Sequence, residues 1–232
     1  ANSKIDISNN FSILEGEQAH QMLFWVNGTD FDYVDVYAMG INSEQYMFSY
    51  TDSGYVKKDD WTDVDPNKFI KEIKENYKAS NSTRQQNGQP TVLNVTWKKK
   101  PYLDGIYNSV YYALDVSWSN NTSSVEGTSI ILGREGYTTG KYIGGDNGYS
   151  EQMLLNISKM HKFNSTKEYK DWKSGDKVAA AGIGALLATT LGVKALKPGI
   201  IAAGLLLLKK FWFIIFLPFI WLGNLFKGSG KK

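Results

Sequence analysis

Apolar and polar residues alternate along much of the first 145 positions, as they do in strands that bury one face. The alternation is clearest at 107–118, where every second side chain from Val110 to Trp118 is large and apolar. Similar stretches lie at 31–39, 45–50, 91–97, 128–132 and 137–143, and the last two are joined by Gly-Arg-Glu-Gly at 133–136. The pattern predicts a strand in each of these stretches.

The period changes to that of a helix between positions 65 and 87. Asp65 is a predicted N-cap, and Pro66 fits the first helical position, where its missing N–H costs nothing. The apolar face of this helix consists of Phe69, Ile70, Ile73 and Tyr77. A second helix is predicted at 150–162, with Met153, Leu154, Ile157 and Met160 facing inward. Ser165 and Glu168 stand three apart, as in a capping box, and predict the start of a third helix.

Many strands with few helices between them indicate an antiparallel sheet with flanking helices. The predicted fold class is therefore α+β for residues 1–176, which form the head of the protein. Residues 177–232 form a different region, an apolar tail that carries lysines.

The tail has the composition of a C-terminal α-helical membrane anchor. From Val178 onward there are seven lysines and no acidic residue. Since the whole chain has a net charge of +3, residues 1–177 have a net charge of −4. Its lysine-free runs are 178–193, 198–208 and 211–226. A run of 16 residues spans about 24 Å as a helix, less than the ~30 Å of a bilayer core, so flanking lysines must reach to the interface. The expected membrane-interface residues are Lys194, Lys197, Lys209, Lys210, Trp212, Trp221 and Lys227.

Small residues recur every fourth position in the first of these runs, at Ala180, Gly184, Ala188 and Gly192. On a helix they form one stripe, where a second helix can approach closely. We therefore expect helix–helix packing there. The alternative is an Ala/Gly-rich helix buried in the head.

Two arrangements of the tail fit its length: a single crossing that ends near Phe226, or a hairpin of 178–208 with 211–226. Lysines near the C-terminus favour a cytoplasmic end and an acidic head outside, hence one crossing. The charge pattern thus predicts a head on the extracytoplasmic side, after removal of a signal peptide. A tail-anchored protein with a cytoplasmic head is the alternative.

Composition excludes several kinds of chemistry. The chain has no cysteine and only two histidines, His20 and His161, so thiolate nucleophiles, disulfides and cysteine-ligated metals are absent. Net positive charge is confined to the tail, while residues 1–177 are net acidic, which is not the pattern of a nucleic-acid-binding protein. We expect no cofactor, no metal and no nucleic acid partner.

Two groups of residues are candidates for chemistry or binding. Asp59, Asp60 and Asp63 could act with Arg134 in a hydrolase or transferase, but acidic residues before a helix start suit the helix dipole, and we favour their interpretation as solvated caps. Trp97 and Pro101 bracket three lysines, either a site for an anionic partner or a solvated strand end.

Several short motifs occur in one order along the chain. Their residues are Gly54, Tyr55, Asp59, Asp60, Asn81, Arg84, Trp97, Pro101, Gly133, Arg134 and Gly136, followed by Gly-Asp-Lys-Val-Ala at 175–179. Together with the apolar tail, they resemble a bacterial family of membrane-anchored proteins, the domain of unknown function 2167 family, over about 46–226. Lys58 and Leu103 depart from the pattern, where an acidic residue and a tyrosine are expected.

The resemblance implies a bacterial envelope protein with an exported head, so the expected location is the bacterial inner membrane, and it implies no reaction. We therefore expect a protein that is not an enzyme and that acts by association, as a subunit or accessory factor of a membrane assembly with lipid, protein partners or further copies of itself. The alternatives are the hydrolase or transferase above and a sensor whose head has an aromatic-lined pocket.

Overall fold

Seven strands form one antiparallel sheet in the order β2-β3-β4-β8-β7-β6-β5 within the described part of the chain. The fold comes from a computed structural model, which describes residues 3–7, 11–27, 34–40, 44–145 and 148–194. The strands are β2 (Phe11–Glu15), β3 (Val36–Gly40), β4 (Gln45–Thr51), β5 (Val92–Asp104), β6 (Ser109–Trp118), β7 (Ser123–Leu132) and β8 (Tyr137–Gly144). A separate ribbon pairs β1 (Ser3–Ile5) with β9 (His161–Phe163). The predicted antiparallel α+β class is confirmed.

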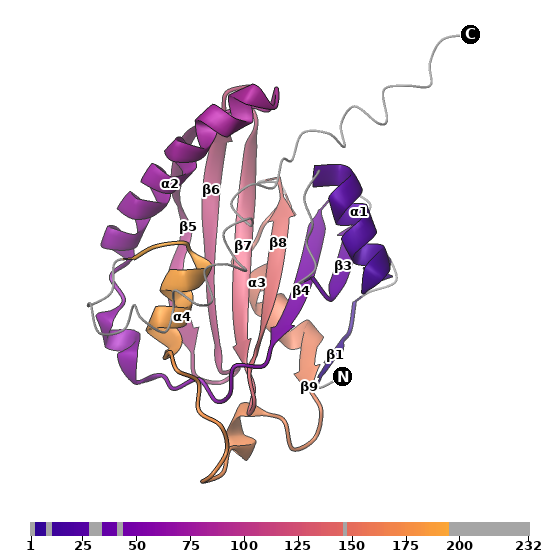
Figure 1. Cartoon of the computed structure of the whole chain (residues 1–232), viewed down its shortest axis with the longest axis vertical. Helices are drawn as coiled ribbons and strands as arrows, with labels where there is room; N and C mark the ends of the chain where they lie inside the picture. Colours follow the sequence, from indigo (N-terminus) through magenta and orange to yellow (C-terminus); the bar gives the residue numbers. More distant parts are fainter. Residues whose placement is uncertain (1–2, 8–10, 28–33, 41–43, 146–147, 195–232) are drawn as a thin grey trace.

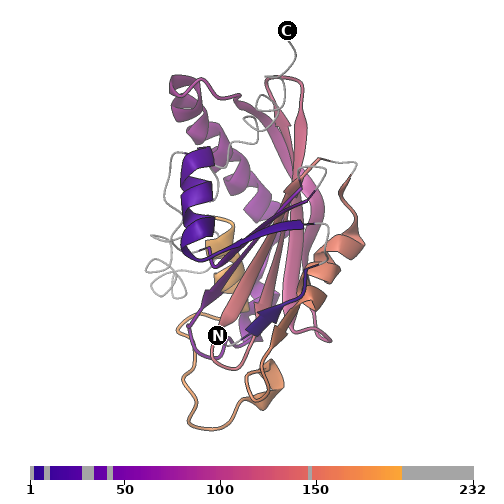
Figure 2. The ribbon, with the colours of Figure 1, turned by 90° about the vertical axis from the view of Figure 1, so that its right-hand side faces the viewer.

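Helices cover both faces of the sheet. Helices α1 (Glu17–Asn27), α2 (Pro66–Gln86) and α4 (Ile183–Thr190) lie on one face, and α3 (Glu151–Met160) lies on the other (Figures 1 and 2). Successive side chains of β6 point to opposite faces of the sheet, so both faces have apolar surface that a helix can cover. Tyr112 and Leu114 belong to the cluster under α2 and α4, whereas Ala113 belongs to the cluster under α3.

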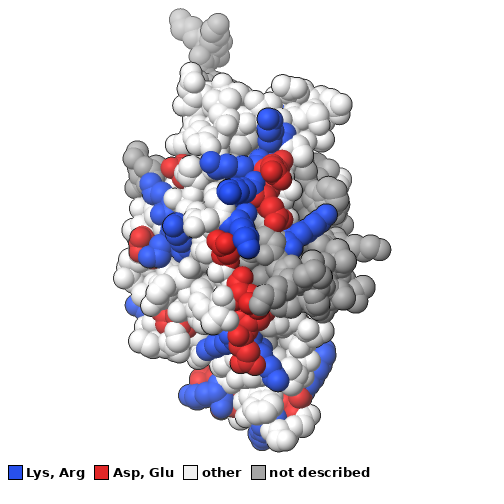
Figure 3. Space-filling view, turned by 90° about the vertical axis from the view of Figure 1, so that its left-hand side faces the viewer, with Lys and Arg blue, Asp and Glu red and all other residues white. Residues whose placement is uncertain are grey.

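Local signals determine the start of α2. The Asp65 side chain accepts hydrogen bonds from the amides of Asn67 (3.0 Å) and Lys68 (3.3 Å), and Pro66 is the first helical residue, as predicted. Phe69, Ile73 and Tyr77 are buried against the sheet. The outer face of α2 mixes lysines with glutamates, the pattern of a helix face in water (Figure 3).

Two glycines let α3 approach the sheet closely. A Cβ at Gly127 would lie 2.5 Å from Leu154, and one at Gly140 would overlap the side chain of Ile157. Glycine inside a strand often marks such an approach. Of the four inward residues predicted for this helix, Leu154 and Ile157 are fully buried, and Met153 and Met160 are partly buried.

The capping box predicted at Ser165 and Glu168 is wrong. Residues 164–167 form a turn closed by the Lys167 amide on the Asn164 carbonyl at 2.9 Å, with Thr166 at φ +70°. Instead Glu168 caps the short 3-10 helix η3 (Tyr169–Asp171), and its amide donates to the Asp171 carboxylate at 3.0 Å. A helix cannot begin at Ser165 because the chain reverses there.

The first apolar run of the expected anchor lies within the head as far as the structure describes it. Ile183, Leu187 and Ala188 of α4 pack in the largest core cluster, together with residues of α2 and β6. The stripe residues Gly184 and Ala188 are buried there, Gly192 is partly buried and Ala180 is exposed. In this structure the packing partner of the stripe is the head itself.

The expected anchor is not seen as a spanning helix. Among the described residues, no helix has the length and apolar character needed to cross a membrane. Of the expected interface residues, Lys194 is described and exposed, and its amide donates to Glu72 at 2.6 Å. The others, Lys197, Lys209, Lys210, Trp212, Trp221 and Lys227, lie outside the described residues.

Candidate functional site

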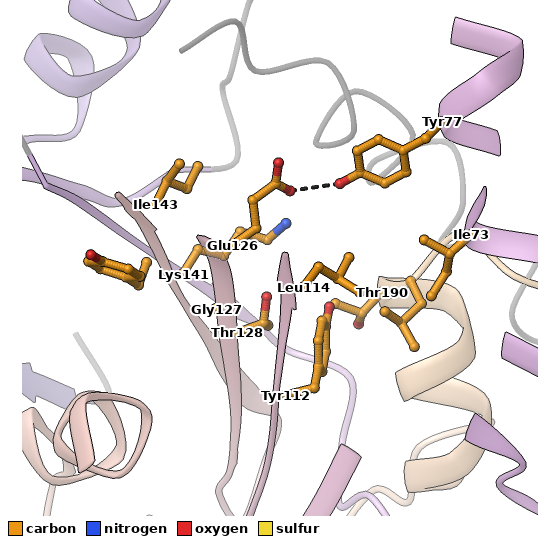
Figure 4. A pocket seen from close by; sticks show the side chains of 12 residues that line it. Ile73, Tyr77, Tyr112, Leu114, Glu126, Gly127, Thr128, Lys141, Ile143 and Thr190 are labelled. Carbon is orange, nitrogen blue, oxygen red and sulfur yellow. Dashed lines mark hydrogen bonds between the residues drawn. The ribbon is translucent and has the colours of Figure 1, made fainter. Parts of the chain in front are cut away.

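A small pocket lies on the inner face of β6, β7 and β8, beneath α2 and beside the end of α4 (Figure 4). The sheet register sets its floor as two rows. Leu114, Glu126 and Ile143 form one row across the three strands, and Tyr112, Thr128 and Lys141 form the next. The pocket is completed by Ile73 and Tyr77 of α2, by Thr190 at the end of α4 and by Leu191 directly after it. A carboxylate and an ammonium group therefore share a mainly apolar and aromatic pocket.

Glu126 is held from above by α2. The hydroxyl of Tyr77 donates a hydrogen bond of 2.7 Å to the Glu126 Oε2 (Figure 4). Burial raises the pKa of the Glu126 carboxyl, and the bond from Tyr77 and the charges of Lys141 and Arg84 oppose that rise. Burial also raises the pKa of Tyr77 well above its usual value. The phenol thus remains a donor, and Glu126 is fixed as its acceptor.

Lys141 lies diagonally across the strand pair from Glu126, because Thr128 is its direct partner and Ile143 is that of Glu126. In the described structure, the Lys141 nitrogen and the Glu126 carboxylate oxygens lie more than 4.0 Å apart, so the two residues form no ion pair. Burial lowers the pKa of Lys141 to about 8, although the charge of Glu126 opposes this. Both residues remain partly exposed, so the pocket opens to solvent beside them.

The cavity measures about 30 Å³, which is room for about two water molecules. A carboxylate, an ammonium and several hydroxyls can form directed hydrogen bonds there inside apolar walls. No group of three or more histidine, aspartate and glutamate side chains suited to a metal occurs among the described residues.

Arg84 lies near this pocket but outside its lining. Its guanidinium stacks 4.6 Å from the ring centre of Trp118, and its side chain is fully buried. Burial lowers the pKa of Arg84, and the charge of Glu126 opposes this. The motif residue Arg84 thus contributes positive potential on the pocket side of α2.

The motif residues Gly133, Arg134 and Gly136 form the turn between β7 and β8, where Arg134 pairs with Asp176. Its Nε and one terminal nitrogen each donate to the Asp176 carboxylate at 2.7 Å. The hydrogen bond from Arg134 is the main cause that lowers the pKa of Asp176 to about 2. A Cβ at Gly136 would overlap the carbonyl of Thr51. The turn therefore fastens the 173–176 loop to the sheet.

Gly54 and Tyr55 lie at the same end of the molecule as the turn at 133–136, where the Gly54 amide donates to the Glu135 carbonyl. Gly54 has φ +87°, and a Cβ there would lie 2.8 Å from the Lys177 carbonyl. Tyr55 stacks on Tyr169, with ring centres 4.4 Å apart, and contacts Trp172 at 5.2 Å. These motif residues join segments 53–56 and 169–179, which is a structural role.

Asp60 and Arg134, both part of the alternative enzyme hypothesis, have different hydrogen-bond partners. The Asp60 carboxylate accepts hydrogen bonds from the amides of Gly184 (2.9 Å) and Ala185 (3.0 Å), at the start of α4. Asp59 and Asp63 are the first and last residues of the short helix η1 (Asp59–Asp63). In the described residues, Arg134 and Asp60 thus each have a separate structural partner.

The remaining motif residues tie α2 and β5 together. Asn81 donates to and accepts from the backbone of Val92 at 2.9 and 2.8 Å. The Trp97 indole donates to the Pro66 carbonyl at 3.0 Å. Pro101 follows the three lysines on β5, which ends the sheet, and Lys99 pairs with Glu151 at 2.7 Å. Lysine and proline on an edge strand discourage pairing with another sheet.

The sequence profile of a family described as "Protein of unknown function (DUF2167)" matches residues 1–220. The chain belongs to this family. The resemblance inferred from the ordered motifs is confirmed, and the DUF2167 match also includes the N-terminal region before Tyr46. Comparison with curated proteins gave no match.

Two solved structures resemble this DUF2167 protein distantly. One is cyanobacterial PsbP (CyanoP) from Synechocystis sp. PCC 6803, with 13% identity, a TM-score of 0.38, and coverage of 70% of this chain and 87% of that one. The other is LpqN, involved in cell envelope biogenesis of Mycobacterium tuberculosis, with 9% identity, a TM-score of 0.30, and coverage of 68% and 78%.

Sequence reasoning missed both charged residues of the pocket. Glu126 is in phase with the inward residues Ile130 and Leu132, and Lys141 is in phase with Tyr137 and Ile143. A charged residue at an inward position of a strand is the signal that would have found them. Burying a charge costs free energy unless it is paired or hydrogen-bonded, so such residues are rare.

Proposed function

We propose that this DUF2167 protein is a membrane-tethered module that acts by association, with its head held at the bilayer by the C-terminal tail. The observation that carries the proposal is the position of α4. Asp60 and the core under α2 hold it in the head, and the apolar runs 198–208 and 211–226 follow in the sequence. The proposed anchor thus begins after Lys194 instead of at 177.

The composition of those runs supports a membrane location. Phe211 to Phe226 contains tryptophan, phenylalanine, leucine and isoleucine without a charged residue, and lysines stand directly on both sides. Aromatic residues and lysines near the ends of an apolar segment match the bilayer interface. We further propose an extracytoplasmic head at the bacterial inner membrane, because the last lysines favour a cytoplasmic C-terminus.

The membrane proposal is tested by charge insertion in the full chain. Ile215→Asp with Leu217→Asp places two carboxylates in the apolar run, each costing about 3 kcal/mol at the centre of a bilayer. The matched control is Leu93→Asp with Ile106→Asp, because these head residues are 66% and 85% exposed. We expect the control to stay with membranes after an alkaline wash and the tail variant to be released. Equal release of both would contradict the proposal.

The absence of cysteine makes the orientation measurable. Lys71→Cys on the exposed face of α2 and Lys231→Cys near the C-terminus each introduce a single thiol. In cells whose outer envelope is permeabilised and whose inner membrane remains sealed, a membrane-impermeant maleimide should label the head thiol and leave the tail thiol unlabelled. The reverse pattern would place the head in the cytoplasm.

Association is tested by cross-linking in native membranes. The control variant and the wild type should recover the same cross-linked partners or oligomers, and the released tail variant should lose them. A wild-type protein that gives only an uncross-linked monomer would contradict an assembly role.

A second candidate function is a ligand-binding head. The pocket of Glu126, Lys141 and Tyr77 favours it, since polar groups converge there among tyrosines and aliphatic side chains.

A further inference from the structure

Two opposite charges line one cavity without touching each other. Glu126 and Lys141 occupy diagonal positions on β7 and β8, which places their Cα atoms about 7–8 Å apart. They form no ion pair within the described structure, because the Glu126 carboxylate is directed to the Tyr77 hydroxyl (Figure 4). A carboxylate and an ammonium in one partly buried cavity attract each other strongly, so a gap between them is an unusual arrangement.

The gap defines the charges of a complementary ligand. The Glu126 carboxylate keeps acceptor capacity beyond its bond from Tyr77, and an ionised carboxylate accepts from an ammonium group. The Lys141 ammonium has three N–H donors for a carboxylate. A molecule with one positive and one negative end satisfies both residues at once and leaves neither charge uncompensated.

The walls of the cavity define the size of that ligand. Leu114, Ile143 and Leu191 supply apolar surface around the polar groups, and Tyr112 and Thr128 form the adjoining row. A cavity that holds about two water molecules admits a ligand of only a few heavy atoms beside the open edge. Glycine and alanine are the amino acids nearest to this size, and part of each must lie at the open edge, whereas amino acids with large side chains exceed the space.

We propose that the pocket between Glu126 and Lys141 binds a small free amino acid as a zwitterion, with its ammonium on Glu126 and its carboxylate on Lys141. The inference rests on the second candidate function, the ligand-binding head. It is independent of the membrane proposal, because none of its residues belongs to the tail.

The binding experiment uses the full-length protein in detergent and follows ligand binding by NMR and calorimetry. Glycine, L-alanine and D-alanine are compared with acetate and methylammonium, which carry only one of the two charges each. Leucine serves as the test of size. We expect alanine or glycine to bind with a Kd in the range of about 1 mM or below, and acetate, methylammonium and leucine to bind at least about tenfold more weakly.

Paired variants locate the site. Glu126→Gln keeps an acceptor for Tyr77 and removes the charge, and Lys141→Met removes the charge and keeps an unbranched side chain of nearly the same length. Each should weaken alanine binding about tenfold or more. The matched controls are Glu75→Gln and Lys78→Met, both on the exposed face of α2, and these should leave the Kd unchanged. Circular dichroism of each variant establishes that it is folded.

Three results would overturn the inference. They are no amino-acid binding up to about 10 mM, acetate binding as tight as alanine binding, and equal losses in the pocket and control variants. The comparison of ligands on the wild type decides the matter even if a pocket variant fails to fold. Loss of the amino-acid site leaves the membrane partition and cross-linking results unaffected, so the two failures are distinguishable.

Discussion

The Asp60 carboxylate accepts a hydrogen bond of 2.9 Å from the amide of Gly184, 124 positions later in the chain. A second bond, from the amide of Ala185, uses the other carboxylate oxygen at 3.0 Å. The side chain therefore acts as an N-cap supplied from outside the helix, because Gly182, the residue at the cap position of α4, has no side chain that can do so.

Removing this cap should loosen α4. We expect Asp60→Ala to lower the free energy of unfolding by about 1–2 kcal/mol, because two helix amides lose their acceptor and the helix dipole loses a negative charge. Chemical denaturation followed by tryptophan fluorescence measures this. Asp59→Ala removes an exposed carboxylate one residue away and should change stability by less than about 0.5 kcal/mol. Equal effects of the two variants would show that Asp60 is no cap.

Gly184 also permits the close approach of α4 to Asp60. A Cβ at this position would lie 2.6 Å from the Asp60 backbone oxygen, which cannot move aside as a flexible side chain would. We expect Gly184→Ala to destabilise the head by about 1–3 kcal/mol, although alanine is the better helix former. The control is Gly105→Ala, because a Cβ at Gly105 meets nothing within 4 Å. A Gly184→Ala variant as stable as the wild type would contradict the packing of α4.

His161 should make stability depend on pH. Its Nε2 contacts the Thr138 hydroxyl at 2.8 Å, and burial lowers its pKa from 6.5 to about 4. Between these values the unfolded chain binds a proton that the folded protein does not. Stability should therefore fall as the pH drops from about 6.5 to about 4, by up to about 1.4 kcal/mol for each pH unit.

The slope is measured by denaturation at several pH values. His161→Gln should remove this part of it, whereas His20→Gln serves as the control for the other histidine of the chain. If the slope of His161→Gln equalled that of the wild type between pH 4 and 6.5, the assignment would be wrong.

The Arg134–Asp176 pair should fix the loop at 173–176. Both carboxylate oxygens are engaged, and one of them also accepts from the Lys173 amide at 2.8 Å. Arg134→Lys keeps the charge and loses the two-pronged geometry, so amide hydrogen exchange around Lys173 should become faster. Lys170→Ala breaks an exposed pair with Glu168 and should leave the exchange there unchanged.

Acid should release the same loop in a separate range. The pKa of Asp176 is lowered from 3.8 to about 2, chiefly by the hydrogen bond from Arg134. The contribution of this pair is thus complete above about pH 3.8 and is lost as the pH falls through 2, below the range in which His161 titrates.

Sequence patterns predicted elements whose causes are local. The start of α2 follows from Asp65 and Pro66, and the inward residues of α3 follow from helical spacing. The expected strands at 107–118 and 137–143 correspond to β6 and β8. Helix α1 was not predicted, although Ala19 and Leu23 form its buried face at helical spacing.

Whether an apolar run packs in the core of the head or enters the bilayer is less easily predicted. The core of the head and the bilayer both accept Ile183, Leu187 and Ala188, so composition alone does not distinguish them. The long-range contact of Asp60 with Gly184 distinguishes them in this structure, and no local pattern encodes it. The pocket escaped prediction for the same reason, because strand pairing brings Glu126 beside Lys141.

The last described helix of the chain completes the core that the earlier elements begin. Asn76 of α2 donates to the carbonyl of Gly192 across 116 positions, and Tyr55 donates to that of Lys177. Contacts so distant along the chain form late and slow the search for the native state. During synthesis the part of the core that residues 183–194 cover therefore stays exposed until residue 194 has left the ribosome, and a nascent chain at that stage is a natural client for chaperones.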